Sequence, residues 1–146
     1  MIDRPVNVDE ELVLAARDAR LNAYAGYSNF QVGSAVRGGT GRVFVGANVE
    51  NASYGLTMCA ERVAIFSAIA AGERSIRGVA VVTGASGVTP PCGACRQVLL
   101  EFGPNATIYG ANLAGERAVW SAADLLPYAF GADSLDVKRG DAEEIS

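Results

Sequence analysis

Residues 59–103 set the architecture of this chain and read CAERVAIFSAIAAGERSIRGVAVVTGASGVTPPCGACRQVLLEFG. The first thirteen residues, 59–71, are apolar nearly all round a helical repeat and stop at a glycine, which predicts a buried helix. The apolar run within 78–83 predicts a central strand that is covered on both faces. After a loop rich in glycine and proline, a second buried helix is predicted over 92–102. With a further strand at 42–48, the succession of strand, helix and strand predicts a βαβ crossover.

The flanking segments extend this pattern into one sheet with helices around it. Asn7, with Glu10 three residues later, predicts the N-cap of a first helix whose apolar stripe reaches Ala23. Strands at 33–37 and 42–48 are separated by a glycine-rich turn that predicts a hairpin. Ser121, with Asp124 at the third position, predicts the start of a last short helix. Further strands are predicted at 107–110 and 117–120, which makes the whole an α/β fold with a mostly buried mixed sheet.

The composition bounds the chemistry that the chain can perform. Its 146 residues are 50% hydrophobic and 19% charged, which is typical of one compact domain with its own core. There is no histidine, so catalytic Ser-His-Asp and Cys-His arrangements are excluded. Three cysteines cannot all pair within the chain, so the sequence does not predict a disulfide framework.

The net charge of −4 belongs mostly to the C-terminal end. Residues 133–146 hold five acidic against two basic side chains, and the rest of the chain is nearly neutral. Such a balance predicts no nucleic-acid partner. No run of 18 apolar residues is present, so we expect no membrane partner either. Free cysteines and the absence of a signal peptide predict a cytoplasmic protein.

Two cysteine motifs lie where a loop enters a predicted helix: Cys59-Ala-Glu61-Arg62 and Pro91-Cys92-Gly-Ala-Cys95. Helix N-termini stabilise thiolates, so three thiolates on two helix starts can converge on one Zn²⁺. Three protein ligands leave a fourth position open, which is typical of catalytic zinc sites. Glu61 follows a ligand by two residues and can accept a proton from a water there. Arg62 is the candidate to donate to a thiolate sulfur and offset the excess negative charge.

Other uses of these cysteines stay open at this point. A lone C-x-x-C motif also occurs in redox pairs and in structural zinc half-sites, and buried thiols need no function at all. The combination with Cys59-Ala-Glu61, 33 residues upstream, favours metal-assisted catalysis. It matches the signature of the zinc deaminases.

Over most of its length the sequence resembles the small homotetrameric zinc-dependent cytidine deaminases. The resemblance rests on these two motifs and on four others: Tyr27-Ser-Asn-Phe30-Gln-Val-Gly33, Asn48-Val-Glu50-Asn51, Ser53-Tyr54-Gly55 and Leu125-Leu-Pro-Tyr-Ala-Phe-Gly131. It implies a three-layer α/β/α fold with a five-stranded mixed sheet. It also implies one deaminase domain over residues 1–135, followed by an acidic tail at 136–146 that we expect to be disordered.

The resemblance further implies a role for each residue of the site. Cys59, Cys92 and Cys95 would hold one Zn²⁺ per chain, and Glu61 would shuttle protons. Asn48 and Glu50 would hydrogen-bond the ribose, and we expect them to share one target because alternate residues of a strand point the same way. Phe30 would line the base pocket, with Ala60 and the Pro90 carbonyl at the pyrimidine edge. Tyr54 would contact the ribose region across a subunit boundary, and Phe130 would reach a neighbouring subunit's site.

The implied reaction is hydrolytic deamination of cytidine and deoxycytidine to uridine and deoxyuridine by a zinc-activated water, as in pyrimidine salvage. The implied partner is a small nucleoside, bound by a homotetramer whose sites are shared between subunits. Three alternatives stay open. They are deamination of a modified cytosine nucleoside such as an aminoacyl-nucleoside antibiotic, deamination of a base in a nucleic acid, and a non-catalytic zinc or redox module.

Overall fold

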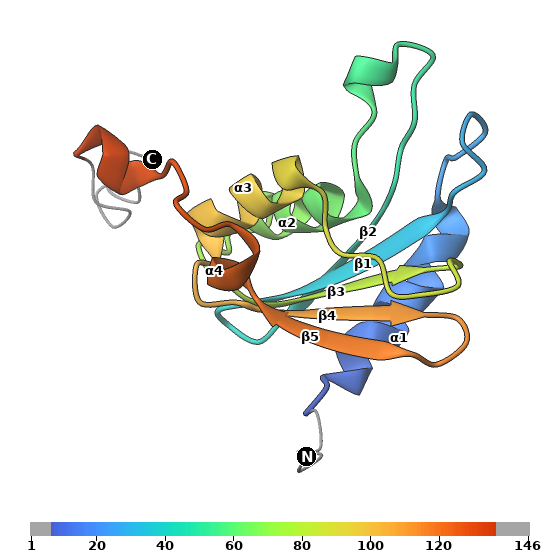
Figure 1. Ribbon diagram of the computed structural model, residues 1–146, viewed down its shortest axis with the longest axis horizontal. Helices are drawn as coiled ribbons and strands as arrows, with labels where there is room; N and C mark the ends of the chain where they lie inside the picture. The colour runs from blue at the N-terminus through green and yellow to red at the C-terminus, as the bar shows by residue number, and fades with distance from the viewer. Residues whose placement is uncertain (1–6, 137–146) are drawn as a thin grey trace.

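A five-stranded mixed sheet forms the centre of the computed structural model, which describes residues 7–136 (Figure 1). Its strands are β1 (Val32–Gly38), β2 (Val43–Ala47), β3 (Ile76–Thr83), β4 (Thr107–Asn112) and β5 (Arg117–Ser121). Their order in the sheet is β2-β1-β3-β4-β5. The pair β3 and β4 is parallel, and the other neighbours are antiparallel. The predicted mixed sheet is therefore confirmed. The predicted disordered tail, apart from Asp136, lies outside the described residues.

Helices cover both faces of the sheet and complete the predicted three-layer α/β/α fold. Helix α1 (Glu10–Ala19) lies on one face, and α2 (Ala60–Ala70), α3 (Gly93–Phe102) and α4 (Ala122–Leu125) lie on the other (Figure 1). Short 3₁₀ turns are η1 (Arg20–Asn22), η2 (Tyr54–Leu56) and η3 (Ala132–Leu135). None of the described helices is long and apolar enough to cross a membrane.

Strand β3 explains why the sheet is buried on both sides. Val79 and Val81 pack into the cluster under α2 and α3, whereas Ala80 and Val82 pack against α1. All four side chains are at most 1% exposed. Alternate residues of a strand point to opposite faces, so a continuous apolar run supplies both cores at once. The prediction of a central strand covered on both faces is confirmed.

The predicted βαβ crossover is confirmed: β2 and β3, which α2 connects, are parallel strands of one sheet, because β1 lies between them and is antiparallel to both. A second parallel pair, β3 and β4, is adjacent and is joined through α3. One expectation needs correction. Helix α2 is buried on one face only: Ala64 and Ile65 are fully buried, but Phe66 is 43% exposed on the outer face. An apolar pattern on every side of a helix does not show which side is buried by the rest of the same chain.

The start of α1 differs from the sequence prediction as well. Its N-cap is Asp9 rather than Asn7, and the Asp9 carboxylate accepts from the backbone N–H of Leu12 at 3.1 Å. The same carboxylate pairs with Arg37 of β1 at 2.9 Å. Asp9 therefore ties the helix to the sheet as well as capping it, which Asn7 cannot do. The α-helix ends at Ala19, before the predicted Ala23.

We expect Asp9→Ala to lower the free energy of unfolding by about 1–2 kcal/mol, because it removes an N-cap and a partly buried ion pair. Burial alone would raise the pKa of Asp9, but the Arg37 guanidinium and the Leu12 N–H outweigh it and hold this pKa below its usual value of 3.8. A lowered pKa stabilises the fold above the unfolded-state value and loses this effect as the pH falls. Denaturant unfolding should therefore show the deficit at pH 7 and a smaller one below about pH 4. The control is Asp18→Ala, because Asp18 is exposed on the same helix; an equal loss in both variants would contradict the prediction.

Helix α2 lies unusually close to strand β2, and this places the N-terminus of α2 over the edge of the sheet. A Cβ atom at Gly46 would lie 2.5 Å from the Ala64 nitrogen and 2.6 Å from the Ala60 carbonyl oxygen. Distances of that kind are not possible for a real side chain, so the approach requires glycine at this position. The first turn of α2 is fixed in place as a result.

Candidate metal centre and adjoining pocket

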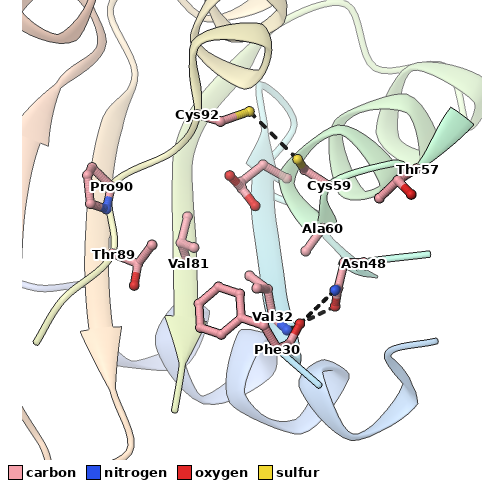
Figure 2. Close-up of a pocket in the computed structure, with 11 residues that line it drawn as sticks. Phe30, Val32, Asn48, Thr57, Cys59, Ala60, Val81, Thr89, Pro90 and Cys92 are labelled. Atoms are coloured by element: carbon pink, nitrogen blue, oxygen red, sulfur yellow. Dashed lines mark hydrogen bonds between the residues drawn. The ribbon is translucent and has the colours of Figure 1, made fainter. Parts of the chain in front are cut away.

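The three cysteines of the chain meet at the N-termini of two helices. Cys59 is the N-cap of α2, Cys92 is the N-cap of α3, and Cys95 lies in the first turn of α3. The Sγ atom of Cys92 lies 3.6 Å from that of Cys59 and 3.5 Å from that of Cys95. All three sulfur atoms lie within 4.8 Å of one another (Figure 2 shows Cys59 and Cys92).

The geometry and the donor set fit a zinc ion. Zn–S bonds of about 2.3 Å in a tetrahedral arrangement place sulfur atoms about 3.8 Å apart, close to the separations seen here. The three thiols differ in burial: Cys59 is half-buried, Cys92 is exposed and Cys95 is 1% exposed. Soft thiolate ligands favour zinc over magnesium or calcium. Bound there, zinc would supply a Lewis acid that makes a water nucleophilic near neutral pH.

The electrostatics of the cluster favour anionic sulfur at Cys59. The neighbouring Cys95 thiol is the main reason why the pKa of Cys59 is lowered to about 5. Burial opposes this effect, and Arg62 also lowers the pKa of Cys59. Interaction with Cys59, burial and the nearby Glu61 charge all raise the pKa of Cys95. Three thiols this close resist joint ionisation, and a divalent cation removes that conflict because it stabilises every thiolate that it binds.

Arg62 lies where the sequence analysis placed it. Its Nη2 donates to the Cys59 sulfur at 3.3 Å, and this contact raises the pKa of Arg62. The Nε atom of Arg62 is buried and has no hydrogen-bond partner among the described residues. The guanidinium is thus held beside the sulfur cluster.

Glu61 is a buried carboxyl group next to the sulfur cluster, with 5% of its surface exposed. It lies in the first turn of α2, one residue after Ala60. Burial raises the pKa of Glu61, and the charge of Cys59 adds to that effect. A raised pKa moves a carboxyl group toward the range where it both accepts and gives protons near neutral pH.

A cavity of about 180 Å³ opens beside these groups, and its lining joins several residues that the sequence analysis singled out (Figure 2). They are Phe30, Asn48, Cys59, Ala60, Glu61, Pro90 and Cys92. The lining also includes four residues that sequence reasoning missed: Val32, Thr57, Val81 and Thr89. Thr57 and Thr89 lie within three residues of a cysteine of the sulfur cluster, and that proximity was the available signal.

Asn48 and Glu50 line two adjoining spaces in the structure. Asn48 lines the cavity, but Glu50 lines a neighbouring hollow together with Tyr54, and Thr57 borders both spaces. The Asn48 amide is also engaged: its Oδ1 accepts from the Val32 N–H at 2.9 Å and its Nδ2 donates to the Phe30 carbonyl at 2.8 Å. Strand β2 ends at Ala47, before either residue, and the binding of one sugar by both side chains stays a prediction.

The two remaining predicted contacts lie farther out. Tyr54 is 75% exposed, and its ring forms a T-shaped pair with that of Tyr27, with ring centroids 6.0 Å apart. Phe130 is 62% exposed and lines neither space. Its carbonyl accepts from the side chain of Gln97 on α3 at 2.8 Å. The C-terminal segment that carries Phe130 extends away from the body of the molecule (Figure 1).

Fold and site together define an α/β protein with a cluster of three cysteines that fits a zinc ion and borders a pocket. Comparison with known proteins makes this more specific. The family model of the cytidine and deoxycytidylate deaminase zinc-binding region matches residues 6–111. The chain belongs to this family.

Relatives and solved structures agree with that assignment. A protein of Halalkalibacterium halodurans named cytidine deaminase is 48% identical over 126 residues, which are 86% of this chain and 96% of the relative. The cytidine deaminase of Mycobacterium tuberculosis is 43% identical over 124 residues, 85% of this chain and 90% of the relative. The crystal structure of a cytidine deaminase from Burkholderia pseudomallei is similar with a TM-score of 0.81 and 52% identity, over 85% of this chain and all of that one.

Proposed function

We propose that this chain catalyses the hydrolytic deamination of cytidine and deoxycytidine to uridine and deoxyuridine. The observation that carries the proposal is the buried Glu61 carboxyl beside three converging thiols, on the wall of a cavity. Relatives that are named cytidine deaminase, one of them 48% identical, support the substrate.

Glu61 moves the protons of the reaction. Its carboxylate accepts a proton from the attacking water and gives it to N3 of the ring, which makes C4 more electrophilic. After the C4–O bond has formed, Glu61 carries the hydroxyl proton to the amino group. The C4–N bond then breaks and ammonia leaves, so that one water is consumed for each ammonia released.

The other residues of the cavity would position the substrate. The Phe30 ring, 41% exposed at the cavity, offers an apolar surface to the base. Backbone groups at Ala60 and Pro90 would contact the pyrimidine edge. Asn48 and Glu50 would bind the sugar, Asn48 from the cavity and Glu50 from the adjoining hollow. Arg62 would offset the negative charge of the sulfur cluster; an Arg62→Gln variant with unchanged zinc content and activity would contradict that role.

We also propose that four copies of the chain assemble and share their sites. The support is the exposure of large apolar side chains beside the hollow, on α2 and in the C-terminal segment: Tyr54, Leu56, Phe66 and Phe130 are between 43% and 75% exposed. Tyr54 and Phe130 would then act on neighbouring subunits. A reducing cytoplasm suits a site of three thiols, and pyrimidine salvage is the process that uses this reaction.

An ultraviolet assay with cytidine, deoxycytidine, cytosine and an aminoacyl-nucleoside antibiotic tests the function, with zinc content and solution mass measured on the same sample. We expect loss of cytidine and deoxycytidine absorbance, one zinc per chain and a particle of about four times the chain mass. Turnover of the antibiotic alone, or of single-stranded oligonucleotides alone, would replace the proposed substrate. Stoichiometric zinc with no turnover would favour a non-catalytic module.

A further inference from the structure

Two polar side chains that follow β2 hold the loop at 27–32, which carries Phe30. Asn48 binds the carbonyl of Phe30 and the N–H of Val32. Glu50 binds the other end of the loop: its Oε1 accepts from the N–H groups of Tyr27 and Ser28, each at 3.0 Å. The residues proposed to bind the sugar therefore also fix the loop that borders the base pocket.

The hydroxyl oxygen of Ser28 contacts both the Glu50 carboxylate and the main chain of Phe30. It donates to Oε2 of Glu50 and accepts from the N–H of Phe30 at 3.0 Å. The Phe30 main chain is thus held from both sides, by Ser28 at its N–H and by Asn48 at its carbonyl. Between them Asn29 takes the left-handed conformation, with φ of 59°, which this short turn requires.

The contacts leave Glu50 ionised and fixed in direction. The hydrogen bond from Ser28 is the main reason why the pKa of Glu50 is below its usual value. Desolvation opposes it, and the two backbone N–H groups lower the pKa further. An ionised carboxylate only accepts hydrogen bonds. The hollow that Glu50 lines with Tyr27, Ser28, Tyr54 and Thr57 therefore presents an oriented acceptor to a hydroxyl group.

We propose that Ser28 is a positioning residue for nucleoside binding: its hydroxyl links the Glu50 carboxylate to the Phe30 main chain, so that recognition of the sugar and placement of the base ring depend on each other. This inference rests on the proposed function. It predicts that Ser28 affects binding of the nucleoside and leaves the chemical step largely unchanged, because Ser28 touches neither the sulfur cluster nor Glu61.

Steady-state kinetics of Ser28→Ala test the inference. We expect KM for cytidine to rise about tenfold, the usual effect of losing a hydrogen bond to a charged group, with kcat changed less than about threefold. Ser28→Thr keeps the hydroxyl and should restore KM. Ser53→Ala is the matched control, because Ser53 is exposed near the hollow without lining it and should leave KM unchanged.

A double substitution and a titration distinguish a specific effect of Ser28 on Glu50 from a general destabilisation of the loop at 27–32. In a Glu50→Gln background, Ser28→Ala should change KM by less than about twofold, because linked residues are not additive. In ¹³C-glutamate-labelled protein, Ser28→Ala should move the Glu50 carboxyl pKa up toward its usual value, with the resonance assigned by its loss in Glu50→Gln.

Each outcome decides a definite point. An unchanged KM in Ser28→Ala, a full effect in the Glu50→Gln background, or an unmoved Glu50 pKa would each overturn the inference. A parent enzyme that turns over no nucleoside would overturn the proposed function instead, and the titration would then still show whether the hydroxyl of Ser28 holds Glu50.

Discussion

Glu61→Gln is expected to bind zinc as the parent does and to lose nearly all turnover, with kcat lower by about 10³- to 10⁴-fold, as for a group that serves as both acid and base. Glutamine keeps the size of the side chain and its place in the buried first turn of α2. It cannot accept a proton from water or return one to the ring nitrogen. The measurement is the rate of cytidine absorbance loss, with zinc content and the unfolding transition recorded on the same preparation.

The matched control for this prediction is Glu101→Gln. Glu101 is exposed on α3, so the same chemical change should leave kcat and zinc content unaltered. If Glu61→Gln retained a kcat within tenfold of the parent, protons would have to move through another group. Loss of zinc together with activity would instead make Glu61 a residue that supports the metal centre.

The sequence predicted the layers of the fold better than the neighbours within the sheet. A continuous apolar run such as 79–82 by itself predicts a strand that is buried on both faces, because each core takes alternate residues from it. The insertion of β1 between β2 and β3 leaves no comparable local trace. It depends on pairing between strands that are distant in the chain. The choice of Asp9 over Asn7 as the N-cap has the same origin, because the partner Arg37 lies 28 residues away.

The site shows the same division between local and distant information. Cysteines at helix starts can be read from spacing, and Cys59, Cys92 and Cys95 do converge. The hydrogen bonds that Asn48 and Glu50 make with residues 27–32 could not be read in this way, because their partners lie about twenty positions earlier in the chain. Ser28 lies in the motif Tyr27–Gly33, and its hydroxyl contacts Glu50, which is 22 positions away in the chain, as well as the nearby Phe30 N–H.

Cys95→Ser is expected to reduce zinc content to about a tenth or less and to abolish turnover, because a neutral hydroxyl replaces a thiolate at a three-ligand site. Cys95 is the most buried of the three thiols, so a solvent water cannot readily replace it as a metal ligand. The rest of the core under α2 and α3 is apolar and does not involve zinc, so the variant should still unfold cooperatively. Metal analysis and circular dichroism on one sample separate the two effects.

Thiol titration of the parent provides an independent readout, because every cysteine of the chain belongs to this cluster. With zinc bound, the thiols should react slowly; after chelation, three should react per chain, and added zinc should restore both protection and activity. Zinc binding displaces protons from thiols, so protection should weaken as the pH falls. Three fast-reacting thiols in a fully active, zinc-loaded enzyme would show that the cysteines are not the ligands. Protection that chelation leaves unchanged would show that burial, rather than metal, shields them.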